Sequence, residues 1–277
     1  MQNIVVGYDE SAAARSALEW VADRCADRTC TVVLAMVTSA LAPAGDHSKN
    51  RLALHEAERR VRDRSPGSHV ESHRVGGTMP KALVMEADHA DLLAIGVHRG
   101  RPIRTALGGW MPSRVIARAD TPVCLVPDDW SASDEPVTVG VDDDASSDAA
   151  LMFAAREAEA GGGRLRIVHA WSMPTPTMEG AVALLASPLQ VKEGHRQILR
   201  DAVRRVRQAR PTLDIEERLI AAPPGGALCA EGPRSSMVVI GTHRRGVLEA
   251  GLIGSVARDV IGEVDIPVCV VPPVTAQ

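Results

Sequence analysis

The fold is decided by the stretch Ile240-Gly-Thr-His-Arg-Arg-Gly-Val-Leu-Glu-Ala-Gly-Leu-Ile-Gly-Ser-Val256. The apolar run 237–240 that leads into it is typical of a buried strand, and Gly254-Ser255 begins a helical pattern that ends near Gly262. A further apolar run follows at residues 266–271. Strand, glycine-flanked loop and helix start follow in the order that presents backbone N–H groups to a phosphate chain. The stretch therefore predicts a phosphate site at the edge of an α/β sheet.

The same arrangement occurs once earlier in the chain, so the protein is a tandem repeat. Four collinear matches support this: Asp9 with Asp142, Gly96 with Gly241, Gly109 with Gly254, and Pro122 with Pro267. The first pair is 133 positions apart and the others are 145 apart, so the second copy holds twelve more residues in its middle. The polar segment 129–135 predicts a linker between domain 1, residues 1–128, and domain 2, residues 136–277. A linker this short predicts that the two domains pack together.

Strand and helix patterns alternate five times in each copy. In domain 1 we expect strands at 3–7, 31–37, 69–75, 92–96 and 123–126, and helices at 11–26, 47–64, 79–90 and 111–119. In domain 2 we expect strands at 137–141, 165–170, 213–220, 237–241 and 268–271, and helices at 147–160, 179–209, 226–231 and 255–263. This alternation predicts a parallel sheet with helices on both faces. Ligands of such sheets bind beyond the carboxyl ends of the strands, where Asp142 and Gly241 lie.

Composition excludes several classes of protein. Hydrophobic residues make up 45% and charged residues 24%, which is typical of a soluble globular chain. A net charge of -4 and only six aromatic residues argue against nucleic-acid and anionic-membrane partners. The N-terminus shows neither a signal peptide nor a transmembrane run. Five cysteines without a Cys-x-x-Cys pair fit a reducing cytoplasm, with Cys124 and Cys269 acting as small hydrophobic residues.

With these features in order, the sequence resembles the universal stress protein family in its tandem form over essentially the whole chain. The resemblance rests on the strand endings Gly7-Tyr-Asp9 and Gly140-Val-Asp142, on Ile167-Val-His-Ala-Trp171, on Gly77-Thr-Met-Pro80, and on Gly254-Ser255 followed by Pro267-Val-Cys-Val-Val-Pro272. It implies two flavodoxin-like, Rossmann-like domains, each with a five-stranded parallel sheet of order 3-2-1-4-5. It also implies that the domains pair through their last strands, as in a dimer.

Family members that bind ATP carry the pattern Gly-x-x-Gly-x9-Gly-(Ser/Thr). By this resemblance Gly241, Gly254, Ser255 and Val256 would hold the phosphates, with Arg244 in place of the second glycine. Asp142 would face the nucleoside or its metal, and the backbone of Ala170 would face the adenine. Asp9 and Val37 are the equivalents in domain 1.

Domain 1 departs further from this pattern than domain 2. Arg99 and Arg244 replace the second glycine in the two copies, and Trp110 replaces the hydroxyl residue in domain 1. An arginine offers a fork of donors to phosphate, although it removes the freedom of a glycine. An indole supplies only one donor and occupies the space of the phosphate oxygens. We therefore expect ATP in domain 2 only, with domain 1 as its structural partner.

Other interpretations stay open at this stage. The chain could be a nucleotide-free interaction or scaffold protein whose two pockets have decayed. The run Asp142–Asp144 could simply begin a helix, because carboxylates are favoured there. The arginines of residues 196–210 fit the solvated face of a helix with a buried stripe at Leu199, Ala202, Val203 and Val206. We find no catalytic constellation and no metal site, so we do not expect an enzyme. The family resemblance implies a regulatory, stress-response protein, and a homodimer of two chains is an open alternative.

Overall fold

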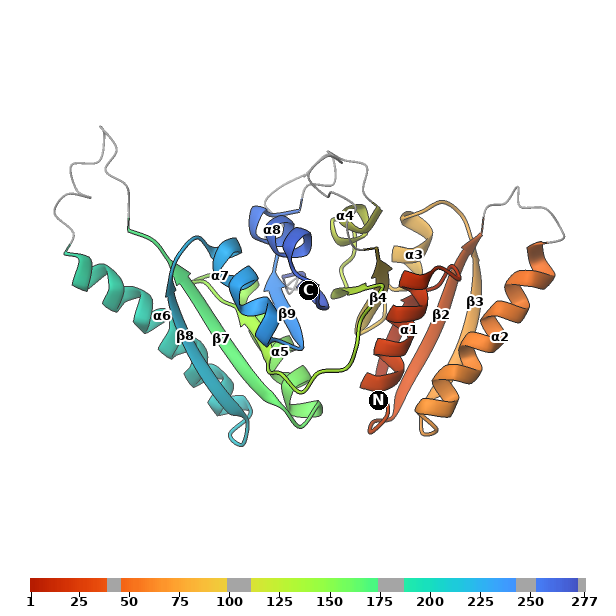
Figure 1. The fold of residues 1–277 in the computed structure, drawn as a ribbon, viewed down its shortest axis with the longest axis horizontal. Helices are drawn as coiled ribbons and strands as arrows, with labels where there is room; N and C mark the ends of the chain where they lie inside the picture. The colour runs from red at the N-terminus through yellow and green to blue at the C-terminus, as the bar shows by residue number, and fades with distance from the viewer. Residues whose placement is uncertain (39–45, 99–110, 174–186, 243–252, 274–277) are drawn as a thin grey trace.

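The computed structural model describes residues 1–38, 46–98, 111–173, 187–242 and 253–273. The two halves of the chain form one ten-stranded sheet that runs through the whole molecule (Figure 1). Its strand order is β3-β2-β1-β4-β5-β10-β9-β6-β7-β8. The N-terminal half supplies one side of this sheet and the C-terminal half supplies the other.

The elements of domain 1 follow the predicted alternation. They are β1 (Gln2–Gly7), α1 (Ala12–Arg24), β2 (Cys30–Thr38), α2 (Asp46–Arg64), β3 (His69–Gly76), α3 (Lys81–Glu86), β4 (Leu92–Val97), α4 (Met111–Ile116) and β5 (Val123–Pro127). Ser11 is the N-cap of α1, because its hydroxyl accepts a hydrogen bond from the Ala14 N–H at 3.0 Å.

Domain 2 repeats this order. Its elements are β6 (Val137–Gly140), α5 (Ala145–Ala160), β7 (Arg164–Trp171), α6 (Pro188–Ala209), β8 (Asp214–Ala221), α7 (Pro224–Glu231), a short 3-10 turn (Gly232–Arg234), β9 (Met237–Gly241), α8 (Ser255–Glu263) and β10 (Val268–Val271). The strand–helix–strand order over residues 237–271, from which the fold was argued, is therefore confirmed at both strands and at the helix start.

Each domain has the strand order 3-2-1-4-5 that the resemblance implied, and all pairings within a domain are parallel. The two last strands, β5 and β10, pair antiparallel and join the domains. In this junction Cys124 lies opposite Cys269, and these are equivalent residues of the two copies. The domains are therefore related by a local two-fold axis that passes close to these two cysteines.

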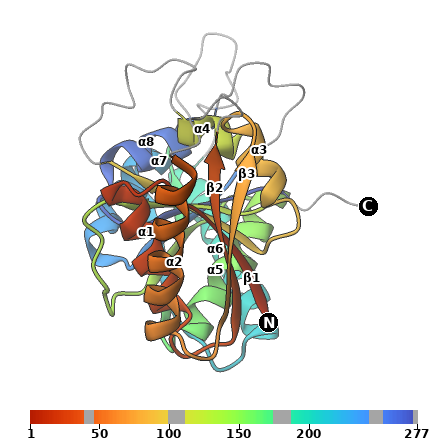
Figure 2. The ribbon, with the colours of Figure 1, turned by 90° about the vertical axis from the view of Figure 1, so that its right-hand side faces the viewer.

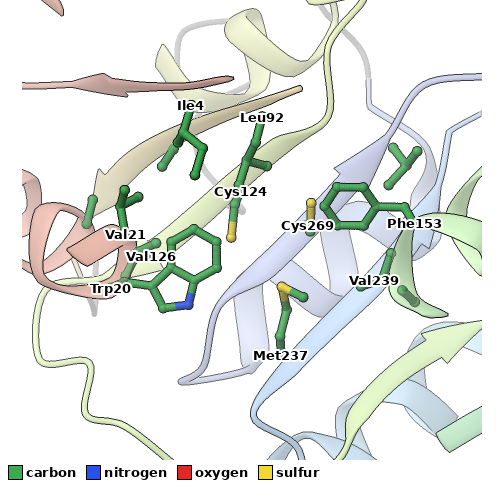
Figure 3. Packing of buried hydrophobic residues seen from close by; sticks show 14 of the residues in the cluster. Ile4, Trp20, Val21, Leu92, Cys124, Val126, Phe153, Met237, Val239 and Cys269 are labelled. Atoms are coloured by element: carbon green, nitrogen blue, oxygen red, sulfur yellow. The ribbon is translucent and has the colours of Figure 1, made fainter. Parts of the chain in front are cut away.

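Helices cover both faces of the sheet (Figure 2). One hydrophobic core lies beneath α1, α2, α5 and α6, and a second lies beneath α3, α4, α7 and α8. Both cores contain residues of both domains. Figure 3 shows the first core where it crosses the junction, with Trp20 of α1 on one side and its equivalent Phe153 of α5 on the other. Burial of apolar surface therefore stabilises the contact between the two domains as well as each domain itself.

A buried ion pair also crosses between the domains. The Arg24 guanidinium of α1 donates to both carboxylate oxygens of Glu157 on α5, with one N–O distance of 2.6 Å. Both side chains are at most 7% exposed. Burial, followed by the positive charge of Arg28, lowers the pKa of Arg24 to about 10. Arg24 and Glu157 occupy equivalent positions, 133 residues apart, so the two copies have opposite charges where they meet.

Some boundaries differ from the predicted ones. Helix α3 begins after Pro80, which cannot donate a backbone hydrogen bond, and ends in a turn at Ala87, so it is shorter than the predicted 79–90. Helix α4 ends at Ile116 instead of 119. Residues 179–186 of the predicted 179–209 helix lie outside the described residues, and α6 begins at Pro188. Within the described parts of the chain, no helix has both the length and the apolar character needed to cross a bilayer.

Candidate functional site

A cavity of about 200 Å³ lies at the carboxyl ends of the domain 2 strands. It is enclosed by the ends of β6, β7 and β9 and by the first residues of α5, α7 and α8. Its lining includes all the predicted site residues that the structure describes: Asp142, Ala170, Gly241, Gly254, Ser255 and Val256. The seventh predicted residue, Arg244, lies outside the described residues. Residues that are up to 114 positions apart in the sequence thus come together at one edge of the sheet.

The start of α8 forms one wall of this cavity. Gly254 is the N-cap and makes no side-chain cap, while its carbonyl accepts the first helical hydrogen bond from the Arg258 N–H at 3.0 Å. Among the residues that the structure describes, a Cβ added at Gly254 would meet no atom within 4 Å. Ser255 is exposed and Val256 is half-buried. A helix start of this kind presents backbone N–H groups and partial positive charge to an anion.

Gly241 at the end of β9 has a different role. A Cβ at this position would lie 2.5 Å from the carbonyl oxygen of Ser146 in the first turn of α5. Gly96 of domain 1 is in the same position, since its Cβ would lie 2.0 Å from the carbonyl oxygen of Ala13 in α1. Such distances are below any normal contact, so both strand ends need glycine for the helix to pack. The match of Gly241 to a nucleotide pattern is therefore explained by packing alone.

The run of three aspartates divides into two roles. Asp144 is the N-cap of α5, because its Oδ1 accepts hydrogen bonds from the N–H groups of Ser146 at 2.8 Å and Ser147 at 2.9 Å. Asp142 is exposed at the rim of the cavity, and its Oδ1 accepts from the Asp143 N–H at 2.9 Å. The helix-initiating interpretation thus holds for Asp144, and the Asp142 carboxylate keeps acceptor capacity toward the cavity.

His169, next to Ala170 in the chain, is hydrogen-bonded to His195, and the sequence did not predict this contact. The Nδ1 of His169 is 2.8 Å from the Val141 carbonyl oxygen, which can only accept, so Nδ1 carries the proton. The Nε2 of His169 therefore accepts from Nδ1 of His195 on α6, also at 2.8 Å. Trp171 stacks on the His195 ring with centroids 5.5 Å apart. Burial, together with His169, lowers the pKa of His195, while the Asp142 carboxylate acts in the opposite direction.

This histidine pair fixes the end of β7 to the end of β6 and to α6. His169 is 1% exposed, and its two hydrogen bonds fully use the neutral imidazole. The neighbouring Ala170 backbone is thereby held at the cavity wall. The signal in the sequence was a histidine within the otherwise apolar run Ile167–Ala170, because a buried imidazole requires two polar partners.

Domain 1 keeps part of this arrangement. Asp9 accepts a hydrogen bond from the Ser11 N–H at 3.1 Å, so it also supports the start of its helix. Gly96 packs as Gly241 does. The two residues that depart from the ATP pattern, Arg99 and Trp110, lie outside the described residues. The Nδ1 of His98, just before this segment, lies 2.8 Å from a carboxylate oxygen of Asp128.

The other candidate groups have structural roles. The buried residues of α6 are the predicted Leu199, Ala202, Val203 and Val206. On the opposite face each arginine has a carboxylate partner: Arg196 and Arg200 with Glu193, Arg204 with Asp201, Arg205 with Asp148, Arg207 with Glu217, and Arg210 with Glu159. This face is therefore neutralised rather than free for an acidic partner. Within the described ranges, no three His, Cys, Asp or Glu side chains gather as they would around a metal ion.

A family model and curated relatives identify the family of this chain. A family model described as the universal stress protein family matches residues 1–127 and 135–272. A universal stress protein of Mycolicibacterium smegmatis is 26% identical over 98% of this chain and 97% of its own length. One of Mycobacterium tuberculosis is 25% identical over 96% of this chain and 95% of its own length.

A solved structure of nearly the same length shows the same fold. A universal stress protein from Archaeoglobus fulgidus covers 98% of this chain and 96% of its own, with a TM-score of 0.73 at 17% identity. A shorter universal stress protein, solved in complex with cAMP, covers 51% of this chain and 100% of its own, with a TM-score of 0.38 at 27% identity.

Proposed function

Because the chain belongs to the universal stress protein family, we propose that it is a regulatory protein that binds ATP in domain 2 and acts through binding rather than catalysis. The observation that carries this proposal is the open start of α8, where Gly254, Ser255 and Val256 line a cavity together with Asp142 and Ala170. Uncapped N–H groups beside open space are the chemistry that a phosphate chain requires.

Each group has a distinct part in the proposed complex. The phosphates lie at the start of α8, where the Ser255 hydroxyl and the backbone N–H of Val256 donate to them. Arg244 adds a positive charge that replaces the missing glycine. The Asp142 carboxylate accepts from the ribose hydroxyls, and the backbone of Ala170 faces the adenine edge. The His169–His195 hydrogen bond holds that backbone in place, which lowers the entropic cost of binding.

A thermal-shift titration with Mg-ATP tests this proposal. Ligand that binds only the native state stabilises it by about 2.7 kcal/mol at a hundred times Kd, so the wild-type melting temperature rises with ATP. Gly254→Val places two methyl groups in the space of the phosphates and weakens binding by about tenfold or more, equivalent to about 1.4 kcal/mol. Gly67→Val is the matched control, since this glycine also has no atom within 4 Å of its would-be Cβ but lies in domain 1.

The expected result is a shift in wild type and in Gly67→Val that is about half as large, or smaller, in Gly254→Val. Absence of any shift at millimolar ATP would disprove the ligand assignment. Titration with cAMP, the ligand of the shorter relative, distinguishes a site for a triphosphate chain from one that accepts adenine nucleotides in general.

A nucleotide-free scaffold is the second candidate function. It is favoured by the packing role of Gly241, because that glycine would be kept without any nucleotide. It is also favoured by Arg99 and Trp110 in domain 1. This candidate predicts that Gly254→Val leaves the melting temperature in ATP unchanged. In either case we place the protein in the cytoplasm, where its five free thiols stay reduced.

A further inference from the structure

A second cavity lies at the edge of the sheet opposite the candidate nucleotide site. It is a cleft of about 910 Å³ between the two domains. Its lining comes from the last turns of α1 and α5, the turns that follow these helices, the starts of β6, β7 and β9, and the linker. The segment that joins β5 to β6 crosses from one domain to the other at this end (Figure 1). The cleft shares no residue with the cavity that Asp142 and Ser255 line.

Arg28, in the turn after α1, lines this cleft without a carboxylate at hydrogen-bond distance. Its side chain is 20% exposed, and its Nη1 lies 4.0 Å from Oε2 of Glu157, too far for a hydrogen bond. Glu157 uses both of its carboxylate oxygens for Arg24. The Nε of Arg28 is buried and has no acceptor among the described residues. A largely buried guanidinium in this state requires an explanation, because buried polar groups are normally hydrogen-bonded.

The surroundings of Arg28 have an excess of positive charge. Two guanidiniums, Arg24 and Arg28, share the single carboxylate of Glu157. Burial, followed by the charge of Arg28, lowers the pKa of Arg24, and burial also lowers the pKa of Arg28. The Nε of Arg24 is likewise buried without an acceptor in the described part of the chain. One further carboxylate beside Arg28 would offset this charge and accept hydrogen bonds from its guanidinium.

The turn after α5, on the other side of the cleft, has no side chains. It is Gly161-Gly-Gly163, and the equivalent residues of domain 1, 133 positions earlier, are Arg28-Thr-Cys30. A Cβ added at Gly162 would meet no described atom within 4 Å. The two copies therefore differ where they border the cleft: one contributes a guanidinium, and the other contributes open space for a small molecule beside it.

The other charges of the cleft favour a ligand that also has a positive group. Its lining carries six carboxylates and three guanidiniums. These are Asp23, Asp27, Asp134, Glu135, Glu157 and Glu159, with Arg24, Arg28 and Arg164. Three of the carboxylates, Asp27, Asp134 and Glu135, belong to exposed residues. They would repel a ligand with a second negative charge and attract an ammonium group.

We propose that this cleft binds a small zwitterion, whose carboxylate pairs with Arg28 and whose ammonium group lies among the exposed carboxylates. The planar guanidinium can donate two parallel hydrogen bonds to one carboxylate. The carbon chain between the two charged groups packs against Trp130, which is half-buried and lines the cleft, and beside the glycine turn. Amino acids and ω-amino acids are the chemical class with this arrangement of charges.

A titration of the full-length protein followed by ¹H–¹⁵N NMR tests this proposal. The probe is 6-aminohexanoate, which has one carboxylate and one ammonium group at the ends of a flexible chain. We expect saturable shifts of the Arg28 Nε–H signal and of the Gly161–Gly163 amides, with a Kd of about 1 mM or lower. Hexanoate, which lacks the ammonium group, should bind about threefold more weakly or worse. Hexylamine and inorganic phosphate should bind about tenfold more weakly or worse.

Three variants assign the binding to Arg28. Arg28→Gln removes the charge and should raise the Kd by about tenfold or more. The variant should stay folded, because the substitution also removes the repulsion between Arg28 and Arg24. Arg28→Lys keeps the charge without the planar fork, so its Kd should lie between those of wild type and Arg28→Gln. Arg59→Gln is the control and should leave the Kd unchanged, since Arg59 is exposed on α2 and does not line the cleft.

The proposal is overturned if 6-aminohexanoate gives no saturable shift up to about 10 mM, tenfold above the expected Kd. It is equally overturned if Arg28→Gln binds as tightly as wild type, because the carboxylate would then lie elsewhere. Hexanoate or phosphate binding as tightly as 6-aminohexanoate would overturn the assignment to a zwitterion. These readouts concern the edge of the sheet opposite Gly254 and need no ATP, so they are independent of the function proposed for domain 2.

Discussion

In domain 1 the end of β4 packs against Ala13, and in domain 2 the end of β9 packs against Ser146, each through a glycine. Thirteen residues beyond each glycine, domain 2 has Gly254 followed by Ser255, whereas domain 1 has Gly109 followed by Trp110. Gly96 and Gly241, which match each other in the two copies, support helix packing. The Ser255 hydroxyl has no counterpart in domain 1, and it is the group that would meet a phosphate. A residue that matches a nucleotide-binding pattern therefore indicates a ligand only where helix packing does not also require that residue.

The same comparison applies where the domains meet. Arg24 and Glu157 are equivalent, and so are Trp20 and Phe153. In a symmetric dimer of identical domains, position 24 would face the same charge in its partner. Fusion of the two copies into one chain allowed the pair to become complementary. The junction thus contains a contact that two identical copies could not make.

The largest expected effect comes from breaking this contact. Glu157→Ala leaves the Arg24 guanidinium buried without its carboxylate, which costs about 3–5 kcal/mol of stability. Urea unfolding followed by circular dichroism measures the loss. The double variant Arg24→Met with Glu157→Leu is the control and should recover most of the stability, because it removes both charges. A loss below about 1 kcal/mol in the single variant would show that this bridge does not matter.

The two packing glycines should have the next largest effect. Gly96→Ala and Gly241→Ala each place a Cβ against the backbone of a helix and cost about 1–3 kcal/mol or more. Gly96→Ala should cost more stability than Gly241→Ala, since the new Cβ would lie 2.0 Å from a backbone oxygen at position 96 and 2.5 Å at position 241. Gly226→Ala within α7, where the Cβ meets nothing within 4 Å, should be neutral or slightly stabilising. Equal costs at all three positions would contradict the packing role.

The smallest effect is a pH dependence that arises from His195 in domain 2. The pKa of His195 is lowered in the folded protein by burial and by His169, so the folded state binds this proton less readily than the unfolded chain. The contribution of His195 to stability should be fully present above about pH 6.5, which is the pKa of an unperturbed histidine. It should be lost as the pH falls below that value. His195→Gln should remove this part of the decline in unfolding experiments between pH 8 and 5. An unchanged pH profile in the variant would exclude His195 as its source.

Much of the fold followed from the sequence because the repeat could be counted. Matched residues at fixed spacings located both copies, and the starts of β9, α8 and β10 were correct to the residue. Helix ends were less well predicted, because Pro80 and the turn at Ala87 limit α3 in ways that apolar spacing does not reveal.

The candidate site was predicted in its members but not in all their roles. Six residues line one cavity because parallel strands end at one edge of the sheet. The packing role of Gly241 could not be predicted, since it depends on how closely α5 approaches β9. The His169–His195 hydrogen bond was missed because α6 had no known position relative to β7. The Arg24–Glu157 pair likewise required the arrangement of the two domains.

The stoichiometry of ATP binding tests the difference between the domains most directly. Equilibrium dialysis of the full-length protein against Mg-ATP counts the nucleotides bound per chain at saturation. We predict one per chain in wild type and in Gly67→Val, and a Kd at least about tenfold higher in Gly254→Val. Zero bound nucleotides would contradict the binding function of domain 2, and two would contradict the assignment of domain 1 as a structural partner.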